Sequence, residues 1–367
     1  MILGRTINSI FTRLGRKFQN FVFRKRLGKT RLGAYLIITV MGFFDLFETY
    51  SNTGEVGRFD HYVPAFMLRR WRVADTGTDR GNLFRWSKVD GTVSNKPING
   101  VAGAVDWDVS TSDGIPSDYV RKKLFAESLE VRTAHVIKLI NTSHVLDLNI
   151  FEESTLAVFM GHQITRVPAF RKSLLSFFSL GYSEGLIRFE DFGSKRALLK
   201  KVVLNEIGIT YTEILNLRAP IQIAGAKSQL HSASLLIGSM IGEKIYKGNL
   251  HVLEVPLDSE DEFVISDNPV VILDVVRGDL LSFIPWWEIG KRDLMIFMPI
   301  SRRKAVFYCN SKRKEGPIEN TNKELVTLVN FGQYKGCSEE VYSQSQPMIQ
   351  NHLNLFTPEL RRMRIVQ

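Results

Sequence analysis

The stretch LHVLEVPLDSEDEFVISDNPVVILD, residues 250–274, contains three short apolar segments separated by charged and turn-forming residues. Short runs of β-branched and apolar residues bounded by Pro, Asp, Asn and Ser are typical of β-strands. LMIFMPI (294–300) and KAVFYC (304–309) continue the pattern. We therefore predict a mostly antiparallel sheet formed by residues 250–310.

The middle of the chain has the periodicity of helices. Apolar residues recur at three- and four-residue steps in DYVRKKLFAESLEVRTAHVIKLI (118–140) and in STLAVFMGHQITRVPAFRKSLLSFFSL (154–180). The cluster Glu152, Glu153 and Ser154 is a helix-opening signal, and Pro168 should kink or divide the second helix. Further helices are expected near residues 194–206 and 222–247, and a last one from about Asn322 to Tyr342.

A small β-region precedes these helices. NLFRWSKVDGTV, residues 82–93, has the pattern of two short strands joined at an Asp-Gly turn. Strands followed by helices and then by strands indicate an α+β fold rather than alternating βαβ units. The prediction is a helical middle packed on a mostly antiparallel sheet, with a small N-terminal β-hairpin.

Most of the net charge lies at the N-terminus. Residues 1–40 contain nine Lys and Arg and no Asp or Glu, so of the total charge of +10 only about +1 belongs to the remaining chain. Nucleic acid is therefore one candidate partner, but the nearly neutral charge of residues 41–367 does not support it. The apolar residues of the first 22 positions recur at helical spacing, and a basic amphipathic helix is typical of contact with a membrane surface or an acidic partner.

The run LGAYLIITVMGFF, residues 32–44, is thirteen residues long, which is too short to span a bilayer. The abrupt change of charge leaves open whether Met1 or Met41 is the native start. Cys309 and Cys337 cannot form a disulfide framework, so a reducing compartment fits best. We predict a cytoplasmic protein, with peripheral membrane contact through residues 1–40 as an option.

Three segments carry candidate functional residues. In HYVPAFMLRRW (61–71), His61 is either an acid, base or ligand held by a rigid turn, or a structural histidine with one hydrogen bond. In EFVISDNPVVILD (262–274), Asp267 and Asn268 either form a turn between two strands or present a carboxylate at a strand end. In GHQITRVPAFR (161–171), Gln163 and Arg166 share a helix face, suited to an anionic group or to a buried pair between Arg166 and Asp267.

Other motif matches are weaker. GYSEG (181–185) follows a helical pattern, whereas the nucleophile elbow that it resembles requires a preceding strand. DFG (191–193) has no partner motif, and DSEDE (258–262) lacks the spacing and the glycine of a calcium loop.

The three segments together resemble the domain of unknown function 4238 family, which occurs in bacteria and some fungi. The matching motifs occur in order as HYVPAFMLRRW, QITRVP, SDNPV, PIS (299–301) and NFGQYKGCSEEVYS (330–343). The resemblance implies one α+β domain over residues 58–345, with an extension and linker over 1–57 and a C-terminal tail over 346–367. The positions at which it implies recurring polar residues are His61, Gln163, Arg166, Asp267, Asn268 and Asn330.

Two functions are consistent with these residues. The first is a hydrolase of the phosphodiesterase or nuclease kind, in which His61, Asp267 and Arg166 are catalytic and Gln163, Asn268 and Asn330 bind an anionic or phosphate-containing substrate, with a divalent metal as a candidate cofactor. The second is a non-catalytic module that senses a ligand or partner, as in bacterial conflict or phage defence. A shared cleft would favour the enzyme, and burial with full hydrogen bonding would favour the second.

Overall fold

The computed structural model describes residues 57–73, 81–105, 107–108, 110–112, 115–117, 120–142, 148–171, 226–281, 289, 293–309, 319–320 and 323–362. The predicted basic helix of residues 1–22, the apolar run after it, GYSEG, DFG and the helix expected near 194–206 lie outside these residues. The chain divides into two units, residues 1–56, 108–124 and 171–233 in one and residues 57–107, 125–170 and 234–367 in the other. The second unit contains the two larger sheets, and the first contains the hairpin of β5 (Ser110–Ser112) and β6 (Ile115–Ser117).

The predicted sheet forms and is mostly antiparallel, but Ile265–Ser266 within residues 250–310 belongs to another sheet, and the strand at Glu319–Asn320, which is part of this sheet, lies beyond residue 310. Its six strands lie in the order β10-β9-β11-β12-β7-β13, with β13 parallel to β7 and every other pair antiparallel. The bounds are β7 Asn249–Glu254, β9 Val271–Asp274, β10 Asp279–Leu281, β11 Leu294–Pro299, β12 Lys304–Cys309 and β13 Glu319–Asn320.

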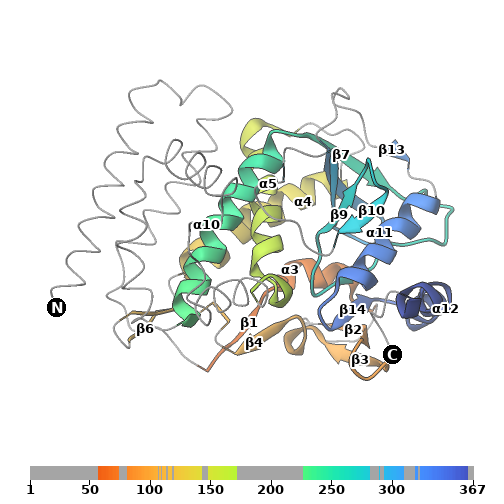
Figure 1. Cartoon of the computed structure of the whole chain (residues 1–367), viewed down its shortest axis with the longest axis horizontal. Coiled ribbons are helices and arrows are strands. Elements are labelled where there is room, and N and C mark those ends of the chain that lie inside the picture. Colours follow the sequence, from red (N-terminus) through yellow and green to blue (C-terminus); the bar gives the residue numbers. More distant parts are fainter. Residues whose placement is uncertain are drawn as a thin grey trace, which may run out of the picture. The chain divides into compact units, whose positions relative to one another are not determined.

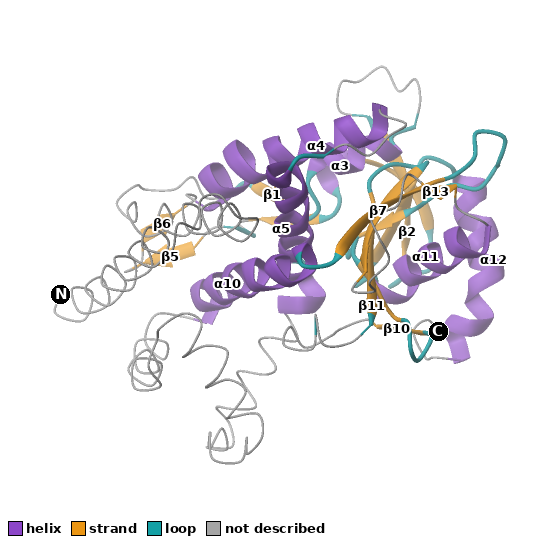
Figure 2. Ribbon diagram, turned by 90° about the horizontal axis from the view of Figure 1, so that it is seen from above, coloured by secondary structure: helices purple, strands orange, loops and turns teal. Residues whose placement is uncertain are grey.

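Helices cover both faces of this sheet in the second unit (Figures 1 and 2). Alternate residues of β12 point to opposite faces. Ala305, Phe307 and Cys309 share a core with Val326 and Val329 of helix α11 (Lys323–Gly336). On the other face, Lys304 Nζ donates to Ile140 O of α4 (Glu130–Thr142), and Tyr308 Oη donates to Glu153 O of α5 (Ile150–Arg166). The predicted packing of middle helices on the sheet is therefore confirmed.

A second sheet holds the N-terminal hairpin. Strands β2 (Asn82–Ser87) and β3 (Val93–Pro97) pair antiparallel around the Asp90-Gly91 turn, as the sequence predicts. This sheet has the order β3-β2-β14-β8, with β8 at Ile265–Ser266 and β14 at Glu340–Ser343. Upstream, β1 (Phe59–His61) pairs with β4 (Gly103–Val105), and the one-turn helix α3 (Ala65–Leu68) and the 3₁₀ turns η2 (Arg69–Trp71) and η3 (Ile98–Gly100) complete the region.

Two helix boundaries differ from the sequence prediction. Helix α5 begins at Ile150, four residues before the predicted start, because Asn149 caps it with the side chain of Glu152 in a capping box. The predicted helix to Tyr342 ends at Gly336, and Glu340–Ser343 form strand β14 because these residues pair with both β2 and β8. The first predicted helix is a π-helical segment η4 (Val120–Leu129) continued by α4.

Two long helices complete the described chain. Helix α10 (Ala226–Tyr246) crosses α5 so closely that a Cβ on Gly161 would lie 2.3 Å from the carbonyl oxygen of Gly238 and 2.5 Å from the backbone nitrogen of Gly242. Helix α12 (Gln346–Arg362) buries Ile349, Phe356 and Leu360 in a core that also contains Trp86, Tyr334 and Val341. None of the helices in the described part combines the length and apolar character needed to cross a membrane.

The docking of α12 should depend on pH through His352. Its ring stacks on Phe356 at 5.4 Å, and burial lowers its pKa to about 4, against a smaller opposing effect of Asp261. The unfolded pKa is about 6.5, so the stabilisation is fully present above pH 6.5 and is lost as the pH falls towards 4. The difference in pKa corresponds to at most about 3 kcal/mol.

His352→Phe keeps an aromatic ring but cannot take up a proton. Between pH 7.5 and pH 4.5 we therefore expect its free energy of unfolding to fall by about 2 kcal/mol less than that of the native chain. Urea unfolding at the two pH values measures this difference. His135 is exposed, so His135→Ala is the control and should follow the native pH dependence. If His352→Phe and the native chain lost the same stability between the two pH values, the lowered pKa of His352 would be contradicted.

Candidate functional site

The carboxylate of Asp267 is enclosed by backbone amides. It follows β8, is 0 % exposed, and accepts hydrogen bonds from Ser338 N at 2.8 Å, Glu339 N at 2.7 Å and Glu340 N at 3.2 Å. Burial raises the pKa of Asp267 to about 7, while the amides of Glu339 and Ser338 act in the opposite direction. Asp267 thus fixes the turn that leads from α11 into β14.

Amide side chains of α11 continue the same network along the edge of β8. Asn330 accepts from Val264 N at 3.0 Å and donates to Glu262 O at 2.8 Å. Gln333 accepts from Ser266 N at 2.9 Å and donates to Pro269 O at 2.9 Å. These bonds satisfy backbone groups that a further strand would otherwise pair. Asn268 Nδ2 donates to Gly336 O at 3.0 Å, which ties the turn to the end of α11.

His61 occupies a different environment, at the end of β1. Its Nε2 donates to Ile98 O at 2.9 Å, and because a carbonyl can only accept, this bond places the proton of the neutral ring on Nε2. Burial lowers the pKa of His61, and the bond to Ile98 opposes this. The lowered pKa favours the neutral ring, in which Nδ1 carries the lone pair.

Arg166, at the end of α5, forms an ion pair that the sequence did not predict. Its Nη1 lies 2.8 Å from Glu130 Oε1, and its guanidinium carbon lies 4.0 Å from the centre of the Phe125 ring. The pair of Arg166 with Asp267 was therefore the wrong alternative, because Glu130 is the carboxylate in contact. The side chain of Arg166 is 5 % exposed and that of Glu130 is 21 % exposed, so the pair reaches the surface on the Glu130 side.

His61 and Arg166 are linked by a charge interaction. Arg166 and Arg69 lower the pKa of His61, and Glu130 raises it. Asp267 acts instead on Tyr62, whose pKa is raised chiefly by burial and then by Asp267. Five of the six candidates therefore form two sets, one with His61 and Arg166 and one with Asp267, Asn268 and Asn330.

Gln163 belongs to neither hydrogen-bond network. It is 0 % exposed on α5, and neither atom of its amide has a hydrogen-bond partner among the described residues. It lies one turn before Arg166, so the two residues share a helix face as the sequence predicts.

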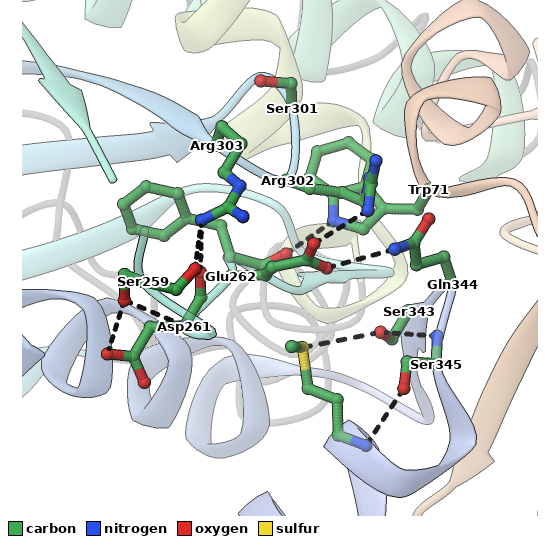
Figure 3. A network of polar contacts seen from close by, with 12 residues as sticks. Trp71, Ser259, Asp261, Glu262, Ser301, Arg302, Arg303, Ser343, Gln344 and Ser345 are labelled. Atoms are coloured by element: carbon green, nitrogen blue, oxygen red, sulfur yellow. Dashed lines mark hydrogen bonds and ion pairs between the residues drawn. The ribbon is translucent and has the colours of Figure 1, made fainter. Parts of the chain in front are cut away.

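The segments HYVPAFMLRRW (61–71) and EFVISDNPVVILD (262–274) are nevertheless in contact. Trp71 Nε1 donates to Phe263 O at 2.7 Å, which fixes the segment after His61 to the segment before Asp267 (Figure 3). Beside this bond, Glu262 pairs with Arg302 at 2.8 Å, and its other oxygen accepts from Gln344 at 3.5 Å. Arg303 donates to the carbonyl oxygens of Ser259 and Asp261. This network fixes loops around the motifs and leaves His61 outside it.

Sequence reasoning missed Glu130 and Phe125. Both lie in the predicted helix over residues 118–140, but nothing in its periodicity distinguishes an ion-pair partner 36 residues from Arg166. The π-helical form of η4 around Phe125 is visible only in the structure. Such segments are frequent at functional sites.

A shallow hollow of about 200 Å³ lies elsewhere, lined by Val255, Pro256, Asp258, Ser259, Asp261, Lys323 and Val326. It contains none of the six candidates. In the described part of the chain, no three His, Cys, Asp or Glu side chains are grouped so that they could hold a metal ion.

Comparison with known families agrees with the motif order. The model of the family described as "Protein of unknown function (DUF4238)" matches residues 60–347, which is most of the chain. The chain belongs to the DUF4238 family. The match begins at Asp60, beside His61, and ends at Pro347, within the first turn of α12, so the DUF4238 region contains both sets of polar residues. No curated protein and no solved structure matches this DUF4238 chain.

Proposed function

We propose that this DUF4238 protein is a hydrolase that acts on a phosphodiester at the site formed by His61, Arg166 and Glu130. The observation that carries the proposal is the state of His61. Its Nε2–H donates to Ile98 O, the pKa of its ring is lowered mainly by burial, and the ring lies in the field of Arg166 and Arg69. A neutral imidazole beside cations suits a general base acting on an anionic substrate.

Each group has a defined part in this proposal. His61 Nδ1 takes a proton from the attacking hydroxyl group. The exposed Arg69 stabilises negative charge on the phosphoryl oxygens, and the buried Arg166, held by Glu130 and Phe125, contributes its positive field at His61. Asp267 takes no part in the step, because its two oxygens already accept three backbone amides.

The second candidate is a non-catalytic module that senses an anionic ligand, in bacterial conflict or phage defence. The observation in its favour is that Asp267, Asn268 and Asn330 are all engaged in joining α11 to β8 and β14, as expected for residues that fix the core. Such a module would bind the same phosphate-containing ligand through the exposed Arg69 without turnover.

His61→Ala distinguishes the two functions. With the full chain and bis(p-nitrophenyl) phosphate as the probe, we expect His61→Ala to lower kcat at least about 100-fold, because general base catalysis contributes factors of that order. Release of nitrophenolate measures the rate. His135→Ala, at an exposed histidine of α4, is the matched control and should retain native activity.

Native turnover that survives in His61→Ala would disprove the role of His61. Absence of turnover by the native chain, combined with phosphate binding that Arg69→Ala weakens, would favour the sensing module. Arg69 is exposed, so this substitution leaves the core intact.

A further inference from the structure

The surface next to His61 has the side chains that single-stranded nucleic acids bind. Phe59 is 39 % exposed, and its ring meets the His61 ring edge to face at 5.3 Å. An exposed aromatic ring is a platform on which a base can stack. Phe59 lies on β1, two residues before His61, the proposed general base.

Four arginines lie close to Phe59 in the sequence. Arg58, Arg69 and Arg72 are exposed, and Arg70 is half-buried with an Nε that has no hydrogen-bond partner among the described residues. The one acidic residue of the segment, Asp60, is 4 % exposed. The segment of residues 58–72 is therefore locally basic although the body of the chain is nearly neutral. Exposed basic residues together with an exposed aromatic ring are typical of single-strand binding.

On the basis of the proposed function, we infer that the substrate is single-stranded RNA. The 2′-hydroxyl group of the RNA itself attacks the phosphorus atom, and His61 accepts its proton. RNA carries a nucleophile already placed beside the phosphorus atom, so one general base and cations for the phosphate are sufficient. These are the groups that His61 and Arg69 supply.

The reaction balances with water as the only other participant. His61 Nδ1 takes the proton of the 2′-hydroxyl group, and the 2′-oxygen forms a bond to phosphorus. The bond from phosphorus to the 5′-oxygen breaks, and the 5′-oxygen takes a proton from solvent water. The imidazolium of His61 returns its proton to the hydroxide that remains. The products are a 2′,3′-cyclic phosphate and a 5′-hydroxyl end.

Three single-stranded probes of one sequence test this inference with the full chain: RNA, DNA and fully 2′-O-methylated RNA. We expect cleavage of RNA alone, with 2′,3′-cyclic phosphate ends identified by mass spectrometry. His61→Ala, purified in the same way, should lose at least about 100-fold in rate, which also excludes a contaminating ribonuclease.

Phe59→Ala tests the stacking platform. We expect RNA to bind about tenfold more weakly, because stacking of one base on an aromatic ring accounts for a factor of that order. Phe151→Ala removes another exposed phenyl ring, 59 % exposed at the start of α5, and is the matched control that should bind RNA normally.

The outcomes separate this inference from the function on which it rests. Cleavage of DNA or of 2′-O-methylated RNA at the rate of RNA would overturn the 2′-hydroxyl mechanism and leave a phosphodiesterase. Turnover of bis(p-nitrophenyl) phosphate without cleavage of any strand would overturn RNA as the substrate. No turnover of any probe would overturn both.

Discussion

Asp267→Ala is expected to destabilise the protein by roughly 3–6 kcal/mol, since it removes the acceptor of three backbone amides at a site 0 % exposed to solvent. Each buried amide left without a partner costs about 1–3 kcal/mol, and the three amides of residues 338–340 cannot all turn to water while β14 keeps its pairing. A domain has a total stability of about 5–15 kcal/mol. The variant should therefore be largely unfolded or recovered in low yield.

Urea unfolding followed by circular dichroism measures this effect. Asp267→Asn, which keeps one acceptor oxygen, should lie between Ala and the native residue. Asp258 is exposed, and Asp258→Ala is the control, expected within about 0.5 kcal/mol of the native chain. A catalytic Asp267 predicts the reverse result for Asp267→Ala, a stable fold with lost activity, so native stability would refute the structural role.

Gly161→Ala is expected to cost about 2 kcal/mol or more, because the added methyl group would overlap backbone atoms of α10. The nearest are Gly238 O at 2.3 Å, Gly242 N at 2.5 Å and Gly242 Cα at 2.9 Å, and backbone atoms cannot move aside as a flexible side chain can. The helices must separate, which loosens the packing around both. This cost exceeds the gain of about 1 kcal/mol that Ala brings over Gly in a helix.

A second helical glycine is the control for this substitution. A Cβ on Gly336, at the end of α11, would meet only Asn268 Nδ2 at 3.8 Å, an ordinary contact. Gly336→Ala should therefore be neutral or slightly stabilising. Thermal unfolding of both variants decides the matter, and equal midpoints for Gly161→Ala and Gly336→Ala would show that α5 and α10 have room to adjust.

The local sequence pattern was sufficient to predict most strands, because each is a compact run of apolar residues between turn-forming residues. KAVFYC is strand β12 at its predicted bounds, and the Asp90-Gly91 turn joins β2 and β3. Of the three apolar segments predicted as strands within residues 250–274, the middle one, EFVIS (262–266), forms strand only at Ile265–Ser266. Its earlier residues bond to Asn330 of α11 instead of to a neighbouring strand, and no local pattern specifies such a partner.

Polar residues were harder to place because their partners are distant in sequence. Asp267 was expected to bond to nearby amides if it formed a turn, whereas its partners lie 71 to 73 residues further along the chain. Arg166 pairs with Glu130, which no motif marks. Residue type showed that a carboxylate and a guanidinium needed partners, but only the folded chain determines which ones.

The amides of Asn330 and Gln333 have one further consequence, for self-association. By occupying Val264 N and Ser266 N they close the outer border of β8, which would otherwise be an open template for a strand of another molecule. Helix α11 is made some sixty residues after β8. Until α11 has been synthesised, this edge therefore lacks the side chains that cover it, which exposes it to pairing with other chains.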